Sequence, residues 1–62
     1  MQIVEKYKNE KTGKVVEIVK IIKEGTKRVF FYPRTIEGKR ISRTNFARKY
    51  DAVRLGKAYA NN

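Results

Sequence analysis

Three polar segments, each containing one glycine, divide the first two-thirds of the chain into short runs rich in Val, Ile, Phe and Tyr. The glycines are Gly13 in KNEKTGK, Gly25 in KEGTK and Gly38 in RTIEGKR. Glycine within a short loop between two β-prone runs is typical of a β-hairpin. This pattern predicts antiparallel strands in sequential order. The expected strands cover residues 2–8, 14–23, 27–33 and 39–43.

The second predicted strand is apolar on both of its faces. One parity contains Val16, Ile18 and Ile22, and the other contains Val15, Val19 and Ile21. A strand of this kind usually bends or bulges so that it serves two sheet surfaces. We therefore expect it to bend and to contribute to both sheets of a small barrel.

The last third of the chain changes from strand-like to helical spacing. Phe46, Tyr50 and Val53 lie at positions i, i+4 and i+7, which predicts a helix. Ser42 or Thr44 is the candidate N-cap, because a hydroxyl can accept a hydrogen bond from a free N–H of the first turn.

Other features of this segment argue against one long helix. Gly56 is expected to interrupt any helix there, and the tail at residues 57–62 is expected to fray. In the alternative interpretation, residues 43–49 form a short helical turn and DAVRL (51–55) forms a closing fifth strand. Periodicity favours neither arrangement.

The chain has 62 residues and contains no Cys and no His. A domain this small buries only about 60% of its unfolded surface. Neither a disulfide nor a Cys/His metal site is available to stabilise it. We expect a single small domain over residues 1–62, mostly β. The predicted architecture is a small SH3-like antiparallel barrel or curled sheet of four to five strands with a short C-terminal helix. The alternative is an open three-stranded sheet carrying one packed helix.

The charge balance is strongly positive. Sixteen Lys and Arg against six Asp and Glu give a formal net charge of +10. Such a charge indicates a polyanionic partner, nucleic acid before an anionic membrane. The longest apolar runs, IVKII and VFFY, are far shorter than the roughly 20 residues of a spanning helix, and no secretory signal is visible. We therefore expect an intracellular, cytoplasmic protein, associated with the nucleoid if it binds DNA, and no membrane association.

The segment KRVFFYPRTIEGKR (27–40) combines three consecutive aromatic residues with five cations. Alternation along a strand places Val29, Phe31 and Ile41 on one face, which is the predicted core face. The other face is expected to be solvent-facing, basic at its ends and aromatic at its middle. It contains Arg28, Phe30, Tyr32, Arg34, Arg40 and Ser42. The opposite parity, with Phe30 and Tyr32 in the core, stays open.

A basic sheet face with central aromatic rings suits nucleic acid. Arginines neutralise phosphates and release counterions, and rings stack on bases or wedge at a base step. A second basic patch follows in the C-terminal segment, at Arg43, Arg48, Lys49, Arg54 and Lys57. The predicted nucleic-acid-binding residues are Arg28, Phe30, Tyr32, Arg34, Arg40, Ser42, Arg43, Arg48 and Lys49.

No catalytic constellation is evident in the sequence. His and Cys are missing, and the six acidic residues show no paired-carboxylate spacing. The glycine-containing segments do not match a phosphate-binding loop. We expect neither an enzyme nor a metal or other cofactor.

KIIKEGTKRVFFY (20–32), followed by EGKR and a helical C-terminal segment, resembles the seven-kilodalton chromatin proteins of crenarchaea. Those proteins are lysine-rich SH3-like barrels with a C-terminal helix, and the resemblance covers about residues 14–60. It implies a triple-stranded sheet, here residues 20–32 and 39–44, that lies on the DNA minor groove and wedges apolar side chains into a base step.

The resemblance carries differences at its functional positions. The tryptophan of that family corresponds here to Ile22, and Arg28 and Glu24 lie near its wedge positions. Phe30 or Tyr32 would have to take the wedging role. The chain is also similar in style to small basic barrels encoded by phages and plasmids, and to the three-stranded arm-binding domains of phage integrases.

These observations predict a non-catalytic nucleic-acid-binding protein, with duplex DNA bound at little sequence preference as the first substrate. One alternative is a protein-interaction module, such as a phage-encoded regulator that docks on an acidic host protein, because arginine and aromatic residues also dominate protein hot spots. A further alternative is a ribosome-associated RNA-binding protein.

Overall fold

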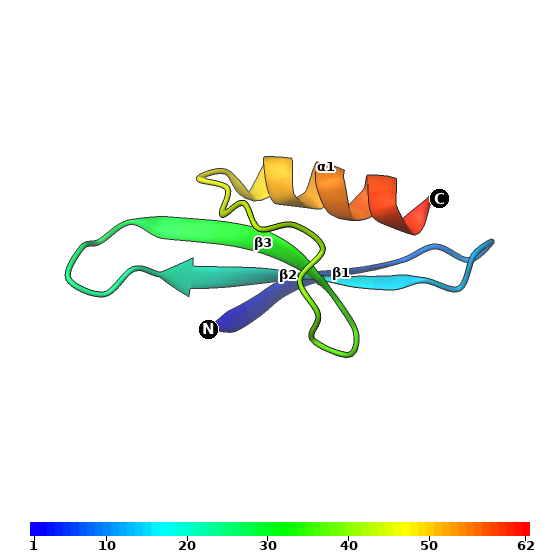
Figure 1. Ribbon diagram of the computed structural model, residues 1–62, viewed down its shortest axis with the longest axis horizontal. Helices are drawn as coiled ribbons and strands as arrows, with labels where there is room; N and C mark the ends of the chain where they lie inside the picture. The colour runs from blue at the N-terminus through cyan, green and yellow to red at the C-terminus, as the bar shows by residue number, and fades with distance from the viewer.

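A three-stranded antiparallel sheet forms one layer of the molecule and a C-terminal helix forms the other (Figure 1). The computed structural model describes residues 1–62. Its elements are β1 (Gln2–Lys8), β2 (Val15–Ile22), β3 (Val29–Thr35) and α1 (Lys49–Ala60), and the strand order is β1-β2-β3. The small, mostly-β class with a C-terminal helix is confirmed. The sheet is open, so the architecture is the alternative rather than the four- to five-stranded barrel.

Residues 39–43, the expected fourth strand, form no regular strand. The segment beside β3 makes only two isolated bridges, Arg34 with Arg40 and Phe31 with Phe46. Between these bridges the segment contains three more residues than β3 does, so a regular ladder cannot form. Pro33 lies at the centre of this edge and has no N–H to donate. The edge is therefore covered by an irregular segment, and the sheet does not close.

The bend or bulge expected in β2 does not appear in its pairing, and the one register irregularity of the sheet lies in β1 instead. The register passes from Ile3 opposite Val19 to Glu5 opposite Ile18, so that Val4 is an extra residue. β2 pairs with β3 without interruption over seven residues. Val16 and Ile18 on one face of β2 and Val19 on the other are all buried, so both apolar faces are packed within a single open sheet.

Helix α1 begins at Lys49, where Arg48 is the N-cap and no side chain provides a cap hydrogen bond. The predicted caps Ser42 and Thr44 are therefore wrong. The helix continues through Gly56 and includes DAVRL, which rules out the fifth strand. Gly56 is buried where the helix crosses the sheet, and a Cβ there would lie 2.7 Å from Cγ1 of Val16. The glycine is needed for close packing and does not end the helix.

Small residues form the buried stripe of α1. Ala52, Gly56 and Ala60 are spaced four residues apart and face the sheet, where Val16 and Ile18 are almost completely buried. Phe31 and Ile41 pack against this core, as their parity predicted, whereas Val29 is half-buried and lies outside it. No helix of the protein is long and apolar enough to cross a membrane.

The end of the chain is held against the β1–β2 hairpin. The hydroxyl of Thr12 donates to the carbonyl oxygen of Ala60 at 2.8 Å. The side-chain amide of Asn9 donates to that of Asn61, and the ammonium of Lys14 donates to the carbonyl oxygen of Asn62. The tail, which was expected to fray, therefore has defined partners.

Candidate nucleic-acid interface

Helix α1 covers only part of the sheet, and the β2–β3 hairpin projects beyond it (Figure 1). Ile18 and Ile22 lie on the same face of β2, yet Ile18 is 1% exposed and Ile22 is 66% exposed. The part of the sheet that α1 covers therefore ends between these two residues. We call residues 20–30 the β2–β3 arm. It is a two-stranded ribbon that extends from the packed part of the molecule.

Cationic side chains surround the turn of the β2–β3 arm. Lys23, Lys27 and Arg28 are exposed there, Glu24 is the only acid nearby in the sequence, and none of these side chains forms an ion pair. The backbone N–H of Lys23 donates to the carbonyl oxygen of Arg28 at 3.0 Å, and Gly25 has a φ of 83°. This hydrogen bond closes the turn, so the backbone that carries the three cations has a defined conformation.

Apolar side chains occupy both faces of the arm. Phe30 is half-buried and pairs with Ile21 on the face turned away from α1, while Ile22 is exposed on the helix side. Phe30 therefore lies on the face where strand alternation placed it. Its ring is only half-buried, so part of it remains accessible.

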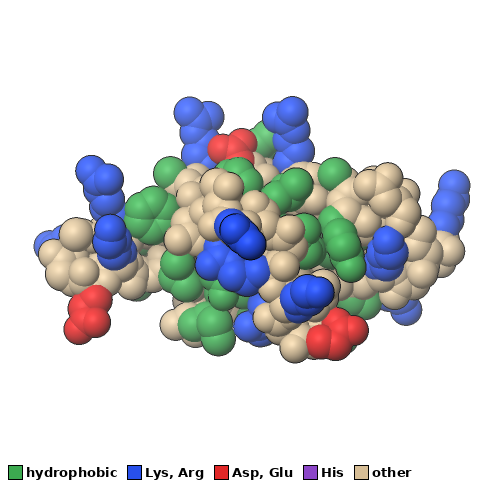
Figure 2. All heavy atoms as spheres, viewed as in Figure 1, with side chains coloured by type: hydrophobic (Ala, Val, Ile, Leu, Met, Phe, Trp, Pro, Cys, Tyr) green, Lys and Arg blue, Asp and Glu red, His purple; other side chains and the backbone are tan.

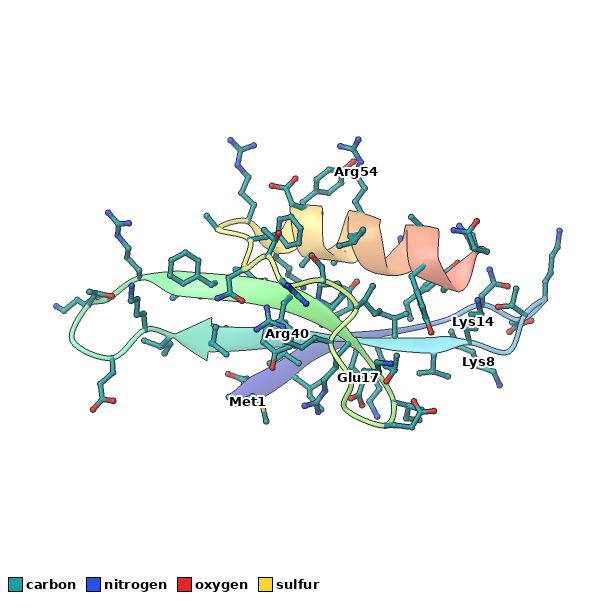
Figure 3. All side chains as sticks on the ribbon, in the orientation of Figure 1. Met1, Lys8, Lys14, Glu17, Arg40 and Arg54 are labelled. Atoms are coloured by element: carbon teal, nitrogen blue, oxygen red, sulfur yellow. The ribbon has the colours of Figure 1, made fainter.

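Tyr32 and Arg40, of which Arg40 is labelled in Figure 3, form a packed pair rather than an open binding face. Tyr32 is only 9% exposed, because the guanidinium of Arg40 lies 3.9 Å from its ring centroid. Arg40 also donates hydrogen bonds to the carbonyl oxygen of Ser42 at 3.1 Å and to the side chain of Asn45. The expectation that Tyr32 faces solvent is wrong, because Arg40 folds over its ring and holds the following loop.

Arg34 is neutralised by a buried acid on the same face. Glu17 is 5% exposed, and its carboxylate accepts a hydrogen bond from Nε of Arg34 at 3.0 Å. The ammonium of Lys6 lies 3.3 Å from the other carboxylate oxygen. The Arg34 hydrogen bond, with Lys6 adding to it, lowers the pKa of Glu17 below its ordinary value of 4.5. Arg34 and Lys6 therefore have an internal partner and are less available to phosphate.

The lowered pKa of Glu17 gives the fold an acid-sensitive contact. The unfolded chain takes up the proton at a higher pH than the folded protein, so the stabilisation is complete above pH 4.5 and is lost as pH falls from there through the lowered pKa. Thermal melts of the wild type and Glu17→Gln between neutral pH and about pH 3 should show their difference in stability shrinking as the acid is titrated. Parallel pH profiles of the two proteins would contradict the ion-pair assignment.

The other predicted site residues lie in the segment that precedes α1 and at the first residue of the helix. Lys49 is paired with Glu5 at 3.2 Å, and the hydroxyl of Ser42 accepts a hydrogen bond from the N–H of Thr44. Arg43 and Arg48 are exposed and form no ion pair.

The position of this segment is fixed by two backbone hydrogen bonds. Phe46 and Phe31 exchange N–H to O bonds of 2.7 and 2.8 Å, which places residues 43–48 beside the root of the β2–β3 arm. The predicted site residues that remain exposed or half-buried and have no ion-pair partner therefore lie together at one end of the molecule. They are Arg28, Phe30, Arg43 and Arg48.

Sequence reasoning missed two members of this group. Lys27 was counted only among the cations of residues 27–40, and Lys23 was not singled out. The signal that could have found them is their position on either side of the hairpin turn. Figure 2 shows Lys and Arg side chains projecting at both ends of the molecule and on the helix side. No three His, Cys, Asp or Glu side chains are grouped closely enough to hold a metal ion.

The fold and the site together define a small, strongly basic protein with a three-stranded sheet, one packed helix and a projecting cationic hairpin. Comparisons of the chain with protein-family models, with curated proteins and with solved structures found no match. Its function is therefore inferred from its own residues.

Proposed function

We propose that the protein is a non-catalytic DNA-binding protein that contacts duplex DNA through the β2–β3 arm, with little sequence preference. The observation that carries the proposal is the exposure of Lys23, Lys27 and Arg28 on a hairpin that extends beyond the helix, without internal acidic partners. Cations placed in this way neutralise phosphates and release counterions, which is the main source of non-specific affinity.

The shape of the arm favours duplex DNA over duplex RNA. The major groove of B-DNA is about 12 Å wide and admits a two-stranded β-ribbon. The major groove of A-form RNA is deep and narrow, and side chains cannot read it. The arm is such a ribbon, and the exposed Arg43 and Arg48 beside its root would add contacts to flanking phosphates.

The side chains of the arm favour low sequence preference. Adenine is read mainly by Asn and Gln, and guanine by Arg or Lys. Residues 20–30 contain no Asn or Gln, so the arm has no adenine reader, and its cations also serve as phosphate contacts. Ile22 and Phe30 offer apolar contacts, which suit thymine methyl groups or partly unstacked bases.

Replacing the three cations at the arm turn tests the proposal. The variant Lys23→Gln/Lys27→Gln/Arg28→Gln should bind a fluorescent duplex at least about tenfold more weakly than wild type at low salt, near 50 mM. The slope of log K against log salt should become shallower by about 2.7, because each lost phosphate contact removes about 0.9. Fluorescence anisotropy over a salt series measures both quantities.

The control removes exposed, unpaired charges elsewhere. In the variant Lys39→Gln/Arg54→Gln both changes lie away from the arm, so the slope of log K against log salt should change much less. If the arm variant binds DNA as well as this control does, the DNA-binding site lies elsewhere than the arm. If wild type does not bind DNA at low salt, DNA binding itself is refuted.

A second candidate function is docking on an acidic protein. The observation in its favour is a surface groove of about 340 Å³ on the outer side of α1, lined by Phe46, Asp51, Arg54, Leu55 and Ala58. An arginine beside an apolar floor suits an acidic peptide with one apolar anchor. A pull-down from nuclease-treated lysate tests this function. Leu55→Glu should no longer capture the partner protein, whereas the arm variant should capture the same protein as wild type.

A further inference from the structure

The two hairpin turns lie at opposite ends of the molecule. Consecutive turns of a three-stranded antiparallel meander must do so, because β2 runs the full distance between them. Figure 1 shows the β1–β2 turn at one end and the β2–β3 turn at the other. The longest extent of the molecule is 41 Å, against 19 and 17 Å in the other directions. The two turns are therefore the most distant parts of the structure.

The β1–β2 turn carries a second group of cations, which we call the β1–β2 end. It consists of Lys8, Lys11, Lys14 and Lys57. Figure 3 labels Lys8 and Lys14 there. The hydrogen bond from Thr12 to Ala60 joins this hairpin to the end of α1, which brings Lys57 to the same end.

None of these four lysines forms an ion pair. Lys8, Lys11 and Lys57 are exposed, and the Lys57 ammonium lies 5.3 Å from the ring centroid of Tyr7. Glu10 is the only acid in the turn. The β1–β2 end is therefore a second positive surface, separate from the β2–β3 arm.

Two acids between the positive ends, Glu5 and Glu17, are paired with cations there, although this part of the molecule keeps a net positive charge. Glu5 pairs with Lys49, and Glu17 pairs with both Lys6 and Arg34. Electrostatic screening reduces the interaction between exposed charges beyond about 10 Å at 0.1 M salt. The molecule is several times longer than this distance, so a phosphate bound at one end hardly affects binding at the other.

We propose that the β1–β2 end is a second phosphate-binding surface, so that one molecule bridges two DNA duplexes. This inference rests on the proposed DNA binding by the β2–β3 arm and adds a second, simultaneous contact. It requires no dimer, because both surfaces belong to one chain. Bridging should therefore be strongest when protein is limiting and should fall at excess protein, when each duplex is coated separately.

A two-duplex capture assay tests the inference. One duplex is fixed to beads, a fluorescent duplex is free in solution, and the wild-type protein is added at low salt. Retained protein is measured by gel staining and retained second duplex by fluorescence. The variant Lys8→Gln/Lys11→Gln/Lys57→Gln removes the same number of charges as the arm variant, and all three side chains are exposed. Circular dichroism checks the fold of each variant, and the single change Lys11→Glu at the turn serves as a second test.

Wild type should be retained on the beads and should capture the second duplex. The β1–β2 end variant should still be retained but capture at least about tenfold less second duplex, because about three phosphate contacts are lost. Wild-type retention without capture would overturn the bridging proposal and leave DNA binding intact, whereas no retention would refute both. Undiminished capture by the β1–β2 end variant would show that bridging occurs through another surface or a dimer.

Discussion

Ile18→Ala is expected to lower the free energy of unfolding by about 2–5 kcal/mol, the usual cost of removing a large aliphatic side chain from a packed core. Ile18 is 1% exposed, and its Cδ1 atom lies close to Gly56 of the helix. A domain of this size has only about 3–9 kcal/mol of total stability. Urea denaturation followed by circular dichroism should therefore show a transition midpoint at a much lower urea concentration than that of the wild type.

Ile22→Ala is the matched control, since it makes the same chemical change on the same face of the same strand. Ile22 is 66% exposed, and its loss should change the free energy of unfolding by no more than about 0.5 kcal/mol. The difference between the two variants measures where the helix stops covering the sheet. Equal losses would mean that the β2–β3 arm is packed and does not project.

Gly56→Leu is expected to lower the free energy of unfolding by about 3 kcal/mol or more, because it overpacks the contact between α1 and the sheet. A Cβ alone would lie 2.7 Å from Cγ1 of Val16, 3.3 Å from Cβ of Pro33 and 3.4 Å from Cδ1 of Ile18. All three neighbours are fully buried and cannot move aside cheaply. Thermal and urea denaturation measure the loss.

The sign of this effect is informative because helix propensity acts in the opposite direction. Leucine favours an exposed helix over glycine by somewhat less than about 1 kcal/mol. Ala58→Leu is the control, because Ala58 is exposed on the same helix and should tolerate the larger side chain with little change in stability. A stabilised Gly56→Leu would show that the helix lies further from the sheet than this structure has it.

The role of each arginine depends on its surroundings rather than on its charge. Arg34 is bound by Glu17, and Arg40 covers Tyr32 and fixes the loop that follows. Arg28, on the β2–β3 arm, has no such partner. The proposed interface therefore moves from the middle of the sheet towards the arm, although all three residues belong to one basic segment.

Local features were predictable from the chain because they depend on neighbouring residues. The two hairpin turns and the turn that follows β3 occur where Gly13, Gly25 and Gly38 adopt positive φ values, which other residues rarely adopt. The strands follow the β-prone runs to within two residues at each end, and alternation placed Phe31 on the core side and Arg34 on the other. The net charge, which indicates a polyanionic partner, also follows from composition alone.

Tertiary contacts decided the rest, because they join residues that are distant in the chain. The sheet stays open because Pro33 lacks a donor where the 39–46 segment should pair and because that segment contains extra residues. Gly56 remains helical because Val16 lies against it, which overrides its low helix propensity. The arm is exposed because α1 extends only as far as Ile18, and the cations that remain free are those that Glu5 and Glu17 do not reach.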